Sequence, residues 1–200
     1  MTWSRGATVA AAALLAAAGA HAQPATDRFA PCASCHGEGG VSPNFETPSL
    51  AGQHSFYAIT QLFLFRAGRR ADEQMTKEAK AMSDDDLRAF SDIIGQLPPA
   101  APFRPDPVDP ARMTRGAALA AKHRCASCHG GDYSGEKQVP RLAGQREDYL
   151  GKALAEFKTG TRIGYTQAMN EALAGLAPSE LPDLAHYLAH LGVVAPAPTR

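Results

Sequence analysis

Two short segments of this chain share a five-residue pattern in which two cysteines, separated by two residues, are followed directly by a histidine. The segments are Cys32-Ala33-Ser34-Cys35-His36 and Cys125-Ala126-Ser127-Cys128-His129, and they use all four cysteines of the chain. Thiols at this spacing can form thioether bonds with the two vinyl groups of a haem, and the histidine then lies beneath the iron as a ligand. The pattern therefore predicts covalent attachment of two haem c groups, which favours electron transfer.

Paired cysteines have two other common uses, disulfide formation and zinc binding. A structural disulfide has no use for the histidine that follows each pair. A zinc site made of four thiolates would need both pairs together, yet they lie about 90 residues apart, far beyond the spacing of a zinc finger. Haem attachment explains the pattern better than either alternative.

The first 22 residues have the features of a secretory signal peptide. Arg5 supplies a positive charge, residues 6–19 are almost entirely small or apolar, and Ala20-His21-Ala22 matches a cleavage site. The apolar stretch is short for a membrane span, although a retained N-terminal anchor is the alternative. No later segment reaches 18 uninterrupted apolar residues. We therefore expect the mature protein to be soluble and exported to the periplasm.

The rest of the chain contains an internal repeat. The block Pro48-Ser49-Leu50-Ala51-Gly52-Gln53 returns as Pro140-Arg141-Leu142-Ala143-Gly144-Gln145, and Tyr57, Leu62, Phe65, Gly68 and Arg70 return as Tyr149, Leu154, Phe157, Gly160 and Arg162. Between the copies lies a proline-rich stretch that cannot be helical. These features predict one domain at 23–97, a linker at 98–111 and a second domain at 112–195.

Both copies show the apolar periodicity of helices, and no segment alternates as a strand would. A helix should end near Gly68 in the first copy and near Gly160 in the second. The last helix of the first copy should begin at Ser83, whose following aspartates favour a helix N-terminus. A leading helix is expected at 113–122, whereas only residues 23–31 precede the first haem motif. The fold class is thus all-α, with two small tandem domains whose thin cores a porphyrin would help to fill.

Methionine is the sixth iron ligand expected of an electron-transfer haem that already has a histidine. Met75 and Met82 are the candidates in the first copy, and Met169 is the candidate in the second. Met169 lies seven residues before Leu176, which precedes the last helix, and Met75 lies seven residues before Met82, which holds the same place. The repeat therefore favours Met75 and Met169 as ligands and Met82 as a core residue.

The other histidines are weaker candidates for iron ligands. His54 has Arg146 as its counterpart in the second copy, so the repeat gives it no shared role. His123 precedes the second haem motif, and His186 and His190 lie on the last helix. We expect these three at the surface or beside the haem propionates.

With these residues in place, the chain resembles the di-haem cytochromes c of the cytochrome c4 family over nearly all of its mature length. The resemblance rests on the two haem motifs, the repeated Pro-x-Leu-Ala-Gly-Gln blocks and the spacing from methionine to the last helix. It implies two class I cytochrome c domains related by a pseudo-twofold repeat, with their haems facing one another near the interface. It also implies that the carbonyls of Pro48 and Pro140 accept hydrogen bonds from His36 and His129. The short leader before Cys32 departs from the family pattern and predicts a weaker or more exposed first haem pocket.

Charge divides unevenly along a chain that is formally neutral. Residues 23–97 have seven Lys and Arg against ten Asp and Glu, whereas residues 112–200 have eleven against eight. This difference of sign could orient the protein toward a redox partner, although net charges of three are also ordinary surface variation. No basic cluster with interleaved aromatic residues suggests nucleic-acid binding.

The leading functional hypothesis is a carrier of single electrons that binds no substrate. Its expected partners are redox proteins, with a dehydrogenase or a bc1-type complex as donor and a terminal oxidase as acceptor, and any membrane association is made through them. A cytochrome subunit of an exported dehydrogenase or oxidase is the alternative. A di-haem peroxidase fits less well, because it needs one iron with an open sixth position and distal acid–base groups.

Overall fold

The computed structural model describes residues 24–101, 107–162 and 166–192. The predicted signal peptide, residues 1–22, and the middle of the predicted linker, residues 102–106, lie outside the described part. Within it, no helix combines the length and the apolar character needed to cross a membrane.

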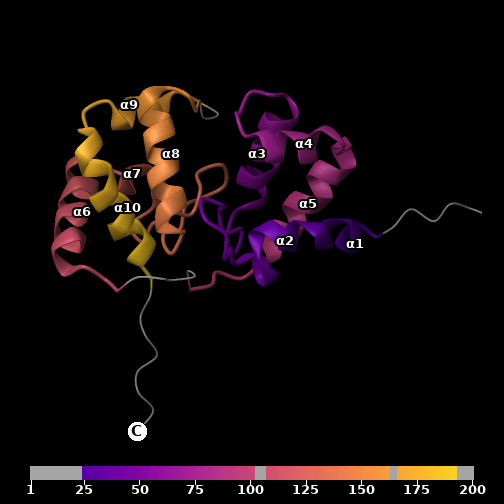
Figure 1. The fold of residues 1–200 in the computed structure, drawn as a ribbon, viewed down its shortest axis with the longest axis horizontal. Helices are drawn as coiled ribbons and strands as arrows, with labels where there is room; N and C mark the ends of the chain where they lie inside the picture. The colour runs from indigo at the N-terminus through magenta and orange to yellow at the C-terminus, as the bar shows by residue number, and fades with distance from the viewer. Residues whose placement is uncertain (1–23, 102–106, 163–165, 193–200) are drawn as a thin grey trace, which may run out of the picture.

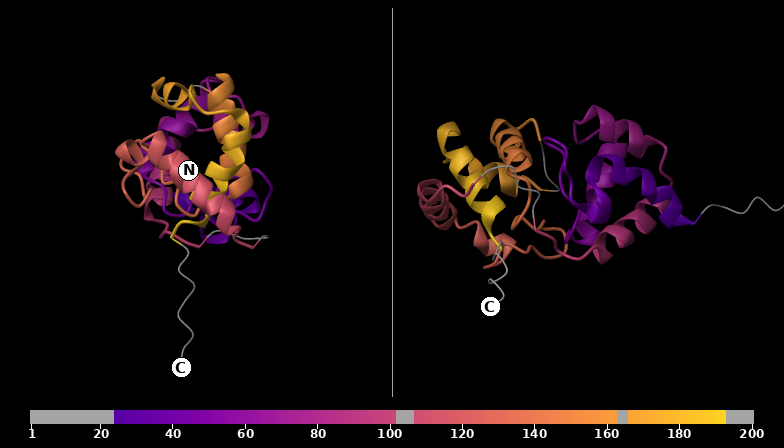
Figure 2. Two further views of the ribbon diagram at one scale, coloured as in Figure 1. Left: turned by 90° about the vertical axis from the view of Figure 1, so that its left-hand side faces the viewer. Right: turned by 60° about the horizontal axis from the view of Figure 1, so that its bottom comes forward.

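The chain forms two helical lobes that lie side by side, one from each copy of the repeat (Figures 1 and 2). The first lobe contains α1 (Ala25–Phe29), α2 (Ala33–His36), α3 (Ser55–Arg66), α4 (Glu73–Lys80) and α5 (Asp84–Gln96). The second contains α6 (Pro110–Lys122), α7 (Ala126–His129), α8 (Glu147–Thr159), α9 (Ala168–Leu173) and α10 (Leu181–His190). An isolated bridge between Glu136 and Val139 is the only β pairing among the described residues. The predicted all-α fold is confirmed.

In the second lobe, α10 packs against both α6 and α8. Leu181, Leu184 and Leu188 recur at helical spacing along α10, and each is at most 5% exposed. Gly116 lets α6 cross α10 closely, because a Cβ atom there would overlap the carbonyl oxygen of Asp183 and the Cβ of Tyr187. The helix α6 begins at Pro110, three residues earlier than the sequence analysis predicts. Asp109 caps it, with Oδ1 accepting from the N–H of Ala111 at 2.8 Å.

In the first lobe, α3 packs on α5, whose start is fixed by a capping box. Ser83 Oγ accepts from the N–H of Asp86 at 3.1 Å, and Asp86 Oδ2 accepts from the N–H of Ser83 at 2.9 Å. The predicted start of this helix at Ser83 agrees with that cap.

The leader of the first lobe is the helix α1, which has five residues where α6 has thirteen. It reaches α5 through an ion pair between Arg28 and Asp86 and through the rings of Phe29 and Phe90, whose centroids lie 5.8 Å apart. None of the residues of α1 itself is buried. The helix that precedes the haem motif therefore covers much less of the first lobe than α6 covers of the second.

Candidate haem-binding sites

Each Cys-x-x-Cys-His segment forms one short helical turn, α2 in the first lobe and α7 in the second. A glycine with positive φ ends each turn, Gly37 at 78° and Gly130 at 83°, a conformation that a side chain would strain. The turn leaves the second cysteine of each pair exposed and the first partly buried, and all four thiols are free. Burial raises the pKa of the Cys32 and Cys125 thiols, so both are protonated at neutral pH.

The histidine of each turn points inward and is oriented by a backbone carbonyl of its own lobe. His36 is 7% exposed and His129 is 4% exposed. His36 Nδ1 lies 2.8 Å from the oxygen of Pro48, and His129 Nδ1 lies 2.9 Å from the oxygen of Pro140. A carbonyl oxygen can only accept, so each Nδ1 carries a hydrogen and each Nε2 keeps its lone pair. Burial also lowers the pKa of both imidazoles, which keeps them neutral and able to bind a metal.

The predicted methionine ligands lie on the short helices that precede the last helix of each lobe. Met75 is in the first turn of α4, where its N–H donates to Asp72 Oδ1 at 2.9 Å, and Met169 is in α9. Both side chains are partly buried against the apolar core of their own lobe. Met82, just before α5, packs against the same cluster of Leu62, Leu87 and Phe90 as Met75 does. The choice of Met75 over Met82 stays a prediction.

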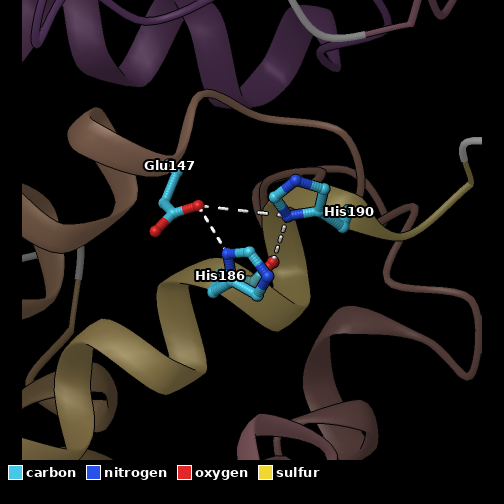
Figure 3. Close-up of side chains that lie close together, drawn as sticks. All are labelled: Glu147, His186 and His190. Carbon is cyan, nitrogen blue, oxygen red and sulfur yellow. Dashed lines mark hydrogen bonds and ion pairs between the residues drawn. The ribbon is translucent and has the colours of Figure 1, made fainter. Parts of the chain in front are cut away.

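The expectation that His186 lies at the surface or beside a propionate is wrong. His186 is 1% exposed, and both of its ring nitrogens are engaged. Its Nδ1 donates to Glu147 Oε2 at 2.8 Å (Figure 3), and its Nε2 accepts from the N–H of Asp109 at 3.0 Å. His190 Nδ1 donates to the carbonyl oxygen of His186 at 2.8 Å. Glu147 and the two histidines have ligand atoms within 4.8 Å of one another, but a metal would have to displace these bonds. The imidazole of His186 instead ties the starts of α6 and α8 to α10.

Two tyrosines and two arginines, paired by the repeat, meet where the lobes touch. Arg70 Nη2 donates to the hydroxyl of Tyr149 at 2.9 Å, and Arg162 Nη2 donates to the hydroxyl of Tyr57 at 3.2 Å. Arg162 Nη1 also donates to Tyr149 at 3.3 Å. These residues recur at a constant offset in the sequence, but the repeat alone assigns them no role. The recurrence of both a tyrosine and an arginine at the same offset is the sequence feature that could have pointed to this contact.

Electrostatics at this contact is dominated by the two guanidinium groups, which are 8% and 5% exposed. Burial alone would raise the pKa of the Tyr149 hydroxyl, but the adjacent Arg162 and Arg70 lower it to about 7. Burial raises the pKa of Tyr57 and Tyr149 adds to that effect, so Tyr57 stays neutral. The hydrogen-bond partners of both guanidiniums are hydroxyl and amide groups. Their positive charge therefore favours an anionic group at the contact between the lobes.

The cysteines, histidine and methionine of each lobe fit a haem c. Two free thiols stand one helical turn apart, and a neutral imidazole beside them has Nε2 without a hydrogen. A methionine packs into the core of the same lobe, so each lobe holds the nitrogen and sulfur donors of an electron-transfer haem. The thiol pairs belong to different lobes, and the cysteines do not come together as a group of metal ligands in the described part of the chain, which argues against the four-thiolate zinc site considered from the sequence.

Comparison with known proteins identifies the fold and the family. The family model for cytochrome c matches residues 113–192. Cytochrome c4 of Pseudomonas aeruginosa is 30% identical over 185 residues, covering 87% of this chain and 90% of the relative. The thiosulfate dehydrogenase electron acceptor of Stutzerimonas stutzeri is 32% identical over 173 residues, covering 80% of this chain and 79% of the relative. The crystal structure of reduced recombinant cytochrome c4 from Pseudomonas stutzeri superposes with a TM-score of 0.76 at 28% identity, covering 84% of this chain and 96% of that structure.

The relatives span both halves of the chain, and the solved structure shares both lobes, so the likeness extends to the whole repeat. It joins the two Cys-x-x-Cys-His turns to a family of electron carriers that hold haem c covalently. The chain therefore belongs to the cytochrome c4 family and is a di-haem electron-transfer protein.

Proposed function

We propose that each lobe is a one-electron site with a defined set of ligands. Cys32, Cys35 and His36 attach and bind the first haem, and Met75 is its sixth ligand. Cys125, Cys128, His129 and Met169 do the same for the second. The observation that carries this proposal is the matched pair of His–Pro hydrogen bonds, 2.8 Å and 2.9 Å long, because each leaves Nε2 free for iron.

The haem iron, when bound, supplies the ferrous–ferric couple. The chain's own residues set the conditions for it. The carbonyls of Pro48 and Pro140 orient the two imidazoles, and Met75 and Met169 would supply the second ligand of each iron, which would leave no open iron position for a substrate. Arg70 and Arg162 are well placed to pair with propionate carboxylates, since the hydrogen bonds of both guanidiniums in the described part of the chain go to tyrosine hydroxyls and one amide and not to a carboxylate.

We further propose that the protein works in the periplasm, after export by residues 1–22, between a dehydrogenase or bc1-type donor and a terminal oxidase. Supporting this, a relative is described as the electron acceptor of thiosulfate dehydrogenase. The same observation supports the second candidate, a cytochrome subunit that stays bound to one exported dehydrogenase. Gentle purification distinguishes the two roles, because a subunit elutes with its enzyme and a free carrier elutes alone.

Redox titration of the holoprotein tests the ligand assignment. Two methionine-ligated haems should titrate as two one-electron steps, show two iron–methionine absorption bands when oxidised and bind no carbon monoxide when reduced. Stoichiometric carbon monoxide binding would mean that one sixth position is open, contrary to the proposal.

A further inference from the structure

The two Pro-x-Leu-Ala-Gly-Gln blocks exchange their glutamine side chains across the contact between the lobes. Gln145 of the second lobe bonds the backbone of Ser49 in the first, with Oε1 accepting from the N–H at 2.8 Å and Nε2 donating to the carbonyl at 2.9 Å. Gln53 bonds the backbone of Arg141 reciprocally, with Nε2 donating at 2.8 Å and Oε1 accepting at 3.2 Å. Both glutamines are buried, at 6% and 8% exposure.

Each glutamine thereby acts on the peptide group that orients the histidine of the opposite lobe. Ser49 follows Pro48, so one peptide unit accepts from His36 through its carbonyl and donates to Gln145 through its N–H. In the second lobe, the peptide unit between Pro140 and Arg141 accepts from His129 and donates to Gln53. A chain of two hydrogen bonds therefore links each imidazole to a side chain from the other lobe.

Hydrogen bonds in such a chain strengthen one another. When Gln145 accepts the N–H of Ser49, it polarises the amide and makes the oxygen of Pro48 a stronger acceptor. A stronger bond at Nδ1 makes the imidazole more electron-rich, which stabilises ferric over ferrous iron and lowers the reduction potential. Burial of the glutamines keeps water from replacing this acceptor.

We infer that Gln145 and Gln53 are crossed positioning residues: Gln145 lowers the potential of the first haem, and Gln53 lowers that of the second. This inference rests on the proposed function, because it needs His36 and His129 as iron ligands. It gives the contact between the lobes a redox role beyond holding them together.

Gln145→Met and Gln53→Met test the inference, since methionine keeps the length of the side chain but cannot accept from the backbone N–H. Gln145→Met should raise the midpoint potential of the first haem, changing its ferrous–ferric equilibrium constant by about twofold or more. The second haem should stay unchanged. Gln53→Met should give the mirror result, a raised potential of the second haem with the first unchanged. The Nδ1 proton of His36 or His129, followed by NMR, should move in the same crossed pattern.

A purely structural role for the glutamines predicts something else. Loosening the contact would shift both haems alike, or shift the haem of the substituted lobe, and either outcome overturns the inference. If a methionine variant does not fold, Gln145→Glu and Gln53→Glu replace it, because a carboxylate still accepts from the N–H. Each glutamate variant should lower the potential of the opposite haem more than that of its own, and the reverse order overturns the inference.

Haem content and ligation are measured first on the unsubstituted protein. Absence of covalent haem, or of histidine ligation in its NMR spectrum, would refute the proposed function itself. Two intact histidine-ligated haems without a crossed shift would refute only the role of the glutamines.

Discussion

The imidazoles of His36 and His129 are oriented for metal binding by contacts within the protein itself. In each, one ring nitrogen is held by a proline carbonyl, and burial keeps the ring neutral. These residues could be predicted from the sequence, because the Cys-x-x-Cys-His spacing specifies both the covalent attachment and the ligand. The contact of His186 with Glu147 and Asp109 could not, because it joins side chains and backbone from three separate elements.

At this scale, the methionine assignment gives a direct prediction. Met75→Ala and Met169→Ala should each open one haem, lower its potential and remove one of the two iron–methionine bands. Met82→Leu is the matched control and should leave both bands in place, because its counterpart in the second lobe is a buried Leu176. Loss of a band in Met82→Leu alone would show that Met82, rather than Met75, binds the first iron.

Among the elements, the leading helices differ most between the lobes. The short leader before Cys32 could be read from the sequence, and the helix α1 that it forms has only five residues. The predicted start of α6 at residue 113 is three residues late, because Asp109 caps the helix and Pro110 begins it. The close crossing of α6 and α10 could not be predicted from the sequence either, because it depends on which residues of the two helices are in contact.

The helix crossing at Gly116 can be tested by adding one methyl group. Gly116→Ala should destabilise the second lobe by about 1–3 kcal/mol, because the new Cβ overlaps the backbone of Asp183 and the side chain of Tyr187. Gly151→Ala is the control, since nothing lies within 4 Å of a Cβ at that position of α8. It should be neutral or stabilising by up to about 1 kcal/mol. Thermal unfolding measures both, and equal stabilities would contradict the close crossing.

For the whole molecule, the important feature is that both haem-binding lobes share a polar, buried contact. The repeat predicted two lobes, but their contact depends on which repeated residues face inward. Arg146, for example, is 7% exposed and its Nη1 donates to the carbonyl of Ser42 in the other lobe at 2.9 Å.

This contact should respond to acid through Asp148. Its carboxylate accepts from Arg146 Nη2 at 2.6 Å and from the N–H of Glu46, in the other lobe, at 3.0 Å. Burial would raise the pKa of Asp148, but these donors hold it below its ordinary value of 3.8. The ionised form is thus favoured in the folded protein, so its contribution is complete above that ordinary value and is lost as pH falls through the lowered pKa.

Asp148→Asn should therefore reduce stability by about 1–3 kcal/mol at neutral pH. The difference from the unsubstituted protein should shrink as both are acidified below pH about 4, because the wild-type carboxylate is then protonated. Denaturant unfolding at several pH values measures this difference. A difference that stays constant from neutral to acid pH would contradict the assigned role of the carboxylate.

The central claim, two covalent haems in one exported chain, is tested most directly by mass. Protein recovered from a cell that matures c-type cytochromes should, under denaturing conditions, have the mass of the chain from residue 23 plus two haem groups. Cys35→Ser and Cys128→Ser should each weaken the retention of one haem. A polypeptide mass with no haem, or one carrying zinc instead, would contradict the account.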